Sequence, residues 1–175
     1  ELLGRADRER LAGLVAELAD GDPLELEERH VALFERGRAH ALHLFEHVHG
    51  DSRDRGDAMV ELTQRYERAG LQLAVNELPD FLPVLLEYLS QRPPDEAREM
   101  LGDCAHILRS LGEALAARGS KYAAVFEALL GIVGERGLDW SRAPEPDPNP
   151  DADWAEAPAF GPDSRRDSPA VAPLR

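Results

Sequence analysis

The stretch AREMLGDCAHILRSLGEAL, residues 97–115, places apolar side chains alternately four and three positions apart. The members of this seam are Ala97, Leu101, Cys104, Leu108, Leu111 and Leu115. Side chains at this spacing share one face of an α-helix and can pack along a partner helix. We therefore predict one continuous helix over these residues, in which Cys104 is a buried and unreactive thiol.

The amino-acid composition favours helices throughout the 175 residues. Leu and Ala contribute 26 and 25 residues, whereas Val, Ile and Thr together contribute 12. Leu and Ala are strong helix formers, whereas β-branched residues are typical of strands. Because 43% of the residues are apolar, the chain can bury a core. We predict an all-α, single-domain helical bundle.

Turn signals outside the seam predict six more helices, and so a bundle of about seven. They lie at about 2–19, from Pro23 to about 35, at about 39–48, from an Asp51-Ser52 cap to Gly70, from Asp80 to about 90, and at 120–134. The helix that ends at Val48 should bury Ala41, Leu42 and Phe45 as well as Val48. The helix that ends at Gly70 has one apolar stripe, formed by Met59, Leu62, Tyr66 and Ala69. The next-but-one helix should take Asp80 as its N-cap and Pro83 as its third residue, where a missing N–H costs nothing.

The last 38 residues, 138–175, hold eight of the thirteen prolines. Proline fixes φ and lacks a backbone donor, so neither helix nor sheet can form over such a segment. Its few apolar residues cannot offset the entropy lost on ordering. We predict a helical domain over residues 1–137 and a disordered acidic tail over 138–175.

Charge and cysteine content exclude several classes of protein. The net charge of −14 repels phosphate backbones, so nucleic acid is not an expected partner. A single cysteine excludes an internal disulfide framework and a Cys-rich zinc site. No apolar run approaches the roughly 18 residues that cross a bilayer, and no secretory leader opens the sequence. We expect a soluble cytoplasmic protein with no stable membrane insertion.

Five of the six histidines fall between His30 and His49. His40, His43 and His47 recur at i, i+3 and i+7, and would lie on nearly one side of a helix. Several imidazoles can bind a transition metal, but a metal site needs ligands fixed from more than one element. We favour structural or surface histidines, and keep as the alternative a metal-binding helical protein that uses His40, His43, His47 and His49.

The sequence contains no phosphate loop, dinucleotide fingerprint, nucleophile elbow or CxxC pair. These are the common sequence signatures of enzymes and of cofactor sites. The usual enzyme signatures are therefore absent. Because the candidate ligands cluster on one helix and its cap, we also predict no stoichiometric metal or cofactor.

Two motifs carry a resemblance to a known family. FEHVHGDSRDRG at residues 45–56 is followed by ELPDFLP at 77–83 and LEYL at 86–89. In this order and at this separation they closely resemble the NarJ family, the nitrate reductase molybdenum cofactor assembly chaperones, also called the delta subunit. The resemblance covers about residues 24–134, and SKYA at 120–123 also looks like the family.

The resemblance implies a TorD-like all-helical fold, no catalysis and no cofactor of the protein's own. The implied partner is the immature molybdenum-containing catalytic subunit of respiratory nitrate reductase. The family holds that subunit off its membrane anchor while iron–sulfur and molybdenum cofactors enter. The client-peptide-binding residues implied by the motifs are Glu46, His47, His49, Arg53, Glu77, Pro79, Asp80 and Tyr88.

A helical bundle can bind an amphipathic helix in an apolar groove, and an acidic rim then selects basic residues near that helix. This reasoning agrees with the resemblance, and we expect the bound helix to be the N-terminal segment of the catalytic subunit. A generic helical adaptor with another partner is the second alternative. The oligomeric state is left open.

Overall fold

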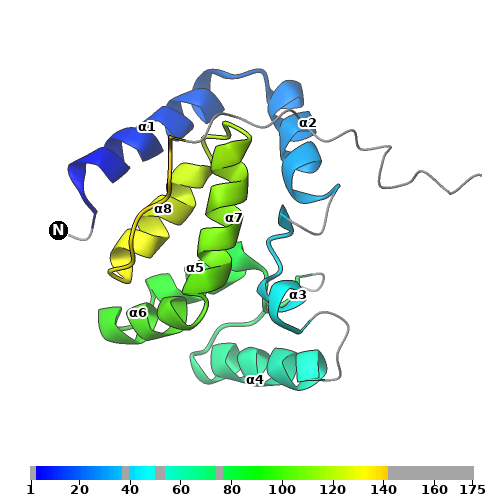
Figure 1. Ribbon diagram of the computed structural model, residues 1–175. Helices are drawn as coiled ribbons and strands as arrows, with labels where there is room; N and C mark the ends of the chain where they lie inside the picture. The colour runs from blue at the N-terminus through cyan, green and yellow to red at the C-terminus, as the bar shows by residue number, and fades with distance from the viewer. Residues whose placement is uncertain (1–2, 37–39, 50–53, 74–76, 142–175) are drawn as a thin grey trace, which may run out of the picture.

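The computed structural model describes residues 3–36, 40–49, 54–73 and 77–141, and these residues form eight α-helices and no strand (Figure 1). The helices are α1 (Arg5–Asp20), α2 (Pro23–Phe34), α3 (Leu44–His49), α4 (Asp54–Arg68), α5 (Leu82–Ser90), α6 (Pro94–Asp103), α7 (Ala105–Ala117) and α8 (Ala123–Ile132). The predicted all-α fold is confirmed.

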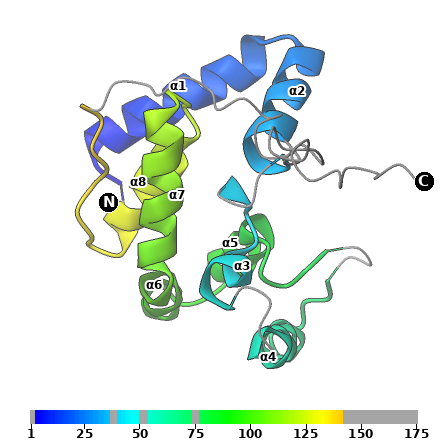
Figure 2. The same cartoon turned by 45° about the vertical axis from the view of Figure 1, so that its right-hand side comes forward.

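The core forms around α7, which stands in the middle of the bundle with α8 beside it (Figures 1 and 2). Leu108 and Leu115 of α7 and Leu130 of α8 have no exposed surface. The two helices approach closely because Gly112 lacks a side chain: a Cβ there would lie 2.8 Å from Cβ of Phe126. Helix α1 also packs against α8. The predicted apolar seam is therefore the centre of the core.

The prediction of one continuous helix over 97–115 is wrong, because the chain breaks at Cys104 into α6 and α7. Cys104 has φ −102° and ψ 9°, outside the helical region. Gly102, two residues earlier, is a weak helix former. The N–H groups of Ile107 and Leu108 both donate to the carbonyl of Cys104, at 2.9 and 3.1 Å. A new helix therefore begins there, and the described helices number eight instead of seven.

The helix at the start of the first motif is shorter than predicted. Residues 40–43 precede α3, which begins at Leu44. Their backbone pairs with a distant segment, since the N–H of Leu82 donates to the carbonyl of Leu42 at 2.8 Å. An isolated antiparallel bridge links the same two segments. This long-range pairing overrides the helical pattern of residues 40–43.

The start of α5 corrects the prediction for Asp80. Phe81 is the N-cap of α5 and Leu82 its first residue, so Pro83 stands at the second position instead of the third. That position also has an N–H without an intrahelical partner, so the proline is still tolerated. The carboxylate of Asp80 accepts a hydrogen bond from Phe45 of α3 and does not cap α5.

Two other helices follow from their local sequence. The side chain of Asp22 caps α2, where its Oδ1 accepts from the N–H of Leu24 at 3.0 Å. Helix α4 buries Leu62 and Tyr66, as its apolar stripe predicts. Gly70 has φ 80° and ends this helical segment in the left-handed conformation. The Asp51-Ser52 cap predicted for α4 lies outside the described residues.

The segment after α8 folds back onto the bundle. Leu138 is buried in the core, and its N–H donates to Oε2 of Glu127 at 2.6 Å. The indole N–H of Trp140 donates to the same oxygen at 3.2 Å. Leu138 therefore packs against the helices at the start of the predicted tail. The predicted division of the chain after residue 137 stays a prediction. Residues 142–175 of the predicted tail lie outside the described residues.

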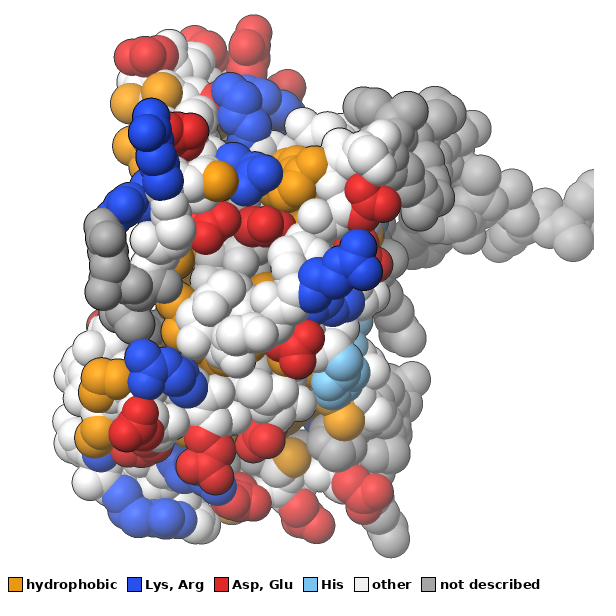
Figure 3. Space-filling view, turned by 60° about the vertical axis from the view of Figure 1, so that its left-hand side comes forward, with side chains coloured by type: hydrophobic (Ala, Val, Ile, Leu, Met, Phe, Trp, Pro, Cys, Tyr) orange, Lys and Arg blue, Asp and Glu red, His pale blue; other side chains and the backbone are white. Residues whose placement is uncertain are grey.

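The surface is rich in charge. Acidic and basic side chains are interspersed on the face drawn in Figure 3, with hydrophobic side chains in small groups between them. Charged residues make up 31% of the chain, which accounts for their density. Within the described ranges, no helix combines the length and the apolar character that a membrane span requires.

Candidate functional site

The two sequence motifs lie against each other in the structure. The N–H of Leu44 donates to the carbonyl of Asp80 at 3.0 Å, beside the bond from Leu82 to Leu42. These two backbone hydrogen bonds attach the first turn of α3 to the start of α5. The arrangement places α3 and the start of α5 on one side of the bundle, next to α4 (Figure 1).

Asp80 is the central residue of this junction. Its side chain has no exposed surface, and its Oδ2 accepts the N–H of Phe45 at 3.0 Å. Phe45 is the second residue of α3, so Asp80 satisfies one of the unpaired donors at the start of that helix. Oδ1 lies 3.4 Å from Nδ1 of His43, and neither atom has a hydrogen-bond partner among the described residues. Asp80 therefore caps α3 from a distant segment.

Pro79 and Tyr88 of the second motif are buried beside α4. The hydroxyl of Tyr66 donates to the carbonyl of Pro79 at 2.7 Å, and the rings of Tyr66 and Tyr88 lie 4.8 Å apart. The hydroxyl of Tyr88 donates to Glu96 at 3.0 Å. Burial raises the pKa of both tyrosines, so both stay neutral donors at physiological pH. These contacts hold α4 and α6 against α5.

Glu46 and His47 of the first motif are half-buried on α3. Oε1 of Glu46 lies 3.4 Å from Nη2 of Arg55 on α4. Nε2 of His47 lies 2.8 Å from the carbonyl oxygen of Ala41. These contacts fix α3 to the start of α4 and to the segment before it.

Three residues implied by the resemblance remain. Glu77 is exposed. Arg53 and the side chain of His49 lie outside the described residues. The described members of the set therefore come from two adjoining segments, some buried and some at the surface.

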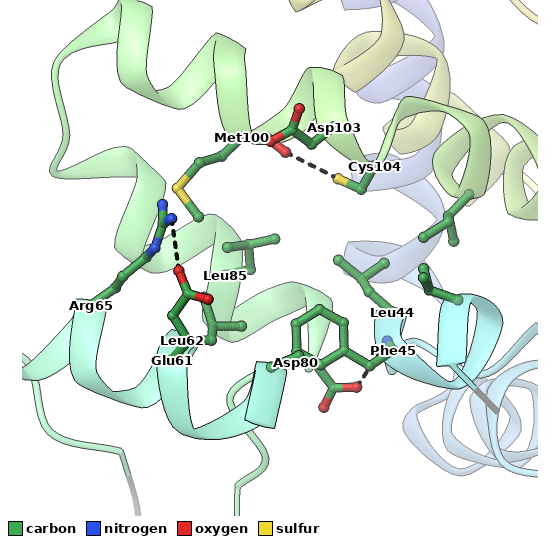
Figure 4. Close-up of a pocket in the computed structure, with 13 residues that line it drawn as sticks. Leu44, Phe45, Glu61, Leu62, Arg65, Asp80, Leu85, Met100, Asp103 and Cys104 are labelled. Atoms are coloured by element: carbon green, nitrogen blue, oxygen red, sulfur yellow. Dashed lines mark hydrogen bonds and ion pairs between the residues drawn. The ribbon is translucent and has the colours of Figure 1, made fainter. Parts of the chain in front are cut away.

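An apolar pocket of about 250 Å³ opens between α3, α4, α5 and the junction of α6 with α7 (Figure 4). Its apolar lining consists of Leu44, Phe45, Val48, Ala58, Leu62, Leu85, Met100, Cys104 and Ile107. Figure 4 shows Leu85 on one side of the cavity and Leu44 on the other. The exposed side chains of Glu61, Arg65 and Asp103 border it. We call this site the apolar pocket.

Val48 lies at the open end of the apolar pocket. It follows Leu44 by one helical turn, so the two side chains share a face of α3. Leu44 is 4% exposed and Val48 51% exposed. The prediction that Val48 is buried is wrong for this chain, because the pocket is open where Val48 lies. An open apolar surface beside a pocket is typical of a site that binds an apolar group of a partner.

Sequence reasoning missed the part of the apolar pocket that α4 and α6 contribute. Ala58, Leu62 and Arg65 recur at i, i+4 and i+7 and so share one face of α4. Met100 lies beside the predicted seam of α6 and not on it. The helical spacing on α4 was the available signal, but it does not reveal which other helices complete the pocket.

Cys104 lines the apolar pocket where α6 meets α7. Its thiol is partly buried and donates weakly to the carbonyl of Leu101 at 3.4 Å. Burial raises the pKa of Cys104 to about 11. The thiolate is the reactive form of cysteine, so this environment agrees with the prediction of an unreactive thiol.

We predict that Cys104 reacts at pH 8 with an aromatic disulfide reagent about 100-fold more slowly in the folded protein than in urea. A pKa raised from 9.0 to about 11 leaves about one hundredth of the thiolate. The folded rate should rise with pH until about pH 11. Absorbance of the released thiol measures both rates. Rates within a few-fold of each other would mean that the thiol ionises as it does in water.

The histidine stripe does not form. His47 belongs to α3, whereas His40 and His43 precede that helix. The described residues contain no group of three or more His, Cys, Asp or Glu side chains placed to hold a metal ion. The described part of the chain therefore does not favour the metal-binding alternative.

Comparison with known protein families assigns the chain. The family described as nitrate reductase delta subunit matches residues 1–128. This chain belongs to that family. The match includes both motifs and every residue that lines the apolar pocket. The resemblance inferred from the two motifs is confirmed.

Several relatives of the chain are named as assembly chaperones. The nitrate reductase molybdenum cofactor assembly chaperone NarJ of Escherichia coli K12 is 50% identical over 131 residues, which cover 75% of this chain and 56% of the relative. The probable chaperone NarW of the same strain is 46% identical over 130 residues, with coverages of 74% and 56%. The probable chaperone NarJ of Bacillus subtilis 168 is 28% identical over 138 residues, with coverages of 79% and 75%. The chain thus spans little more than half the length of the two Escherichia coli relatives.

Proposed function

We propose that this protein is an assembly chaperone of respiratory nitrate reductase. It binds the immature molybdenum-containing catalytic subunit in the cytoplasm and assists cofactor insertion before the complex reaches its membrane anchor. Membership of the delta subunit family and the names of its relatives support this function. The protein acts by binding, and carries out no catalysis of its own.

The observation that carries the proposal is the open apolar pocket with Val48 at its end. Its volume of about 250 Å³ suits a few apolar side chains from one face of a short helix. We propose that this helix is the N-terminal segment of the catalytic subunit, called the client segment below. The apolar face of the client segment supplies most of the affinity by leaving water.

The buried residues implied by the motifs have a structural role in this proposal, and other groups contact the client segment. Asp80, Pro79 and Tyr88 are buried, so we assign them to holding α3, α4 and α5 around the pocket. Contact with the client segment falls to exposed groups, such as Glu61 and Asp103 at the border. Their carboxylates favour basic residues on the client segment, and added salt weakens this attraction without removing the apolar contribution.

Recovery of bound proteins from cells that express nitrate reductase tests the function. The affinity-tagged chain should retain the catalytic subunit, and should retain less of it once cofactors have been inserted. Metal analysis of the purified chain should find no stoichiometric metal. Retention of an unrelated protein in place of the catalytic subunit would support a generic adaptor. One zinc or iron per chain, lost when His47 and His49 are replaced, would support the metal-binding alternative.

A further inference from the structure

A second pocket, of about 340 Å³, lies at the opposite end of α7 from the apolar pocket. Helix α7 has 13 residues and so separates the two by about 20 Å. Three cations line the second pocket: Arg29 of α2, Arg118 at the end of α7, and Lys121 just before α8. We call it the basic pocket. Lys121 is the only lysine in the sequence, and neither the core nor the proposed function explains it.

The carboxylate of Glu17 holds two of the cations of the basic pocket in place. Glu17 of α1 binds Nη1 of Arg29 and Nζ of Lys121, each at 2.8 Å. The hydrogen bond from Lys121 is the main cause that lowers the pKa of Glu17, so the carboxylate stays ionised at neutral pH. The side chains of Arg29 and Lys121 remain about half exposed. Two cations, one from α2 and one from the segment just before α8, are therefore held at the pocket and are accessible to a ligand.

The lining of the basic pocket is positively charged, whereas the chain as a whole is acidic. Three cations and one carboxylate line the pocket, whereas the chain carries a net charge of −14. Among the residues that line the pocket, the one carboxylate balances the charge of one cation. A concave site with surplus positive charge attracts anions. The arginine fork and the lysine ammonium both bind phosphate oxygens well.

We propose that the basic pocket binds a phosphate-bearing ligand. The phosphate oxygens contact the three cations, and the organic part of the ligand lies on the apolar wall formed by Leu26, Leu33 and Tyr122. In the free protein, Glu17 forms ion pairs with two of these three cations. The phosphate displaces Glu17 from both. This proposal is independent of client binding, because the two pockets share no residue.

Calorimetric titration of inorganic pyrophosphate into the full chain at low ionic strength tests the proposal. We expect saturable binding by the wild type and about 10-fold weaker binding by Lys121→Gln. Glu17→Gln should bind about 10-fold more tightly, because it removes the competing charge and keeps the size of the side chain. A purely structural ion pair predicts no such opposite changes. Thermal unfolding verifies that both variants are folded.

A matched control is Arg98→Gln, since Arg98 pairs with Asp95 on α6 at 3.0 Å and does not line the basic pocket. Its affinity for pyrophosphate should equal that of the wild type, and malonate should bind at least about 10-fold more weakly. Pyrophosphate should also protect Lys121 from an amine-reactive ester, as read by mass spectrometry. The proposal is overturned by no binding to the wild type, by equal loss in Arg98→Gln, by equal binding of malonate, or by weaker binding in Glu17→Gln.

Discussion

Replacing Asp80 with alanine is expected to lower the free energy of unfolding by about 3 kcal/mol. The change removes a fully buried carboxylate and leaves the N–H of Phe45 without its acceptor. A buried donor without a partner costs about 1–3 kcal/mol, and the void left between α3 and α5 adds to this. For a domain of this size the midpoint of thermal unfolding should fall by roughly 10 °C. Urea unfolding followed by circular dichroism measures the free energy.

Two further variants help to explain the loss of stability expected for Asp80→Ala. Asp80→Asn keeps an oxygen that accepts the N–H of Phe45, so we expect a loss of about 1 kcal/mol. Asp103→Ala removes an exposed carboxylate from the border of the apolar pocket and should change stability by less than about 0.5 kcal/mol. Equal losses in Asp80→Asn and Asp80→Ala would assign the effect to the charge that faces His43. Wild-type stability of Asp80→Ala would contradict the cap on α3.

Burial was predictable wherever the spacing of apolar residues along a single helix identifies the face that packs on the core. Leu108, Leu111 and Leu115 recur along the seam, and each is at most 1% exposed. Leu62 and Tyr66 were predicted in the same way from the stripe on α4. Such positions need no knowledge of the partner helix, because an apolar face of this width is buried against some neighbour in any stable bundle.

The junction of the two motifs was not predictable from local sequence. Asp80 precedes an apolar run that contains a proline near its start, which is the local pattern of a helix N-cap. Its carboxylate instead binds the N–H of Phe45, 35 positions away in the sequence. The same pairing removes residues 40–43 from α3. Both differences come from hydrogen bonds between distant segments, which periodicity does not report.

The apolar pocket depends on the same long-range junction. Its lining comes from α3, α4, α5, α6 and α7. The separation of these helices along the sequence does not indicate which of them contact one another. Val48 was predicted as a core residue because its spacing from Leu42 and Phe45 is helical. The spacing was informative about the face, since Val48 does line the pocket. It could not tell that the pocket is open where Val48 lies.

This geometry makes Val48 the most informative position for client binding. We predict that Val48→Glu weakens binding of a synthetic client segment more than 100-fold, while the fold is retained. Val48 is 51% exposed, so the change costs little in the free protein. In the complex the new carboxylate would be taken out of water against an apolar helix face, which costs several kcal/mol without a partner. It would also lie among the acidic groups that border the pocket.

Val15→Glu is the matched control, because Val15 is exposed on α1 and does not line the apolar pocket. Both variants add the same charge, so a general effect of net charge on attraction of the client segment would appear in both. Calorimetric titration should show wild-type affinity for Val15→Glu and no measurable heat for Val48→Glu. Circular dichroism verifies the fold of each.

Titration of these variants and of the wild type also tests two claims separately: that the protein binds the client segment, and that the apolar pocket is the binding site. If Val48→Glu binds the client segment as tightly as the wild type, the helix lies elsewhere on the bundle and the apolar pocket is not its site. If the wild type does not bind the client segment at any salt concentration, capture of that segment is wrong. Recovery of the catalytic subunit from cells would then still support the chaperone function through another surface. Because Cys104 lines the apolar pocket, slower thiol reaction in the presence of the client segment would place the bound helix there by an independent measurement.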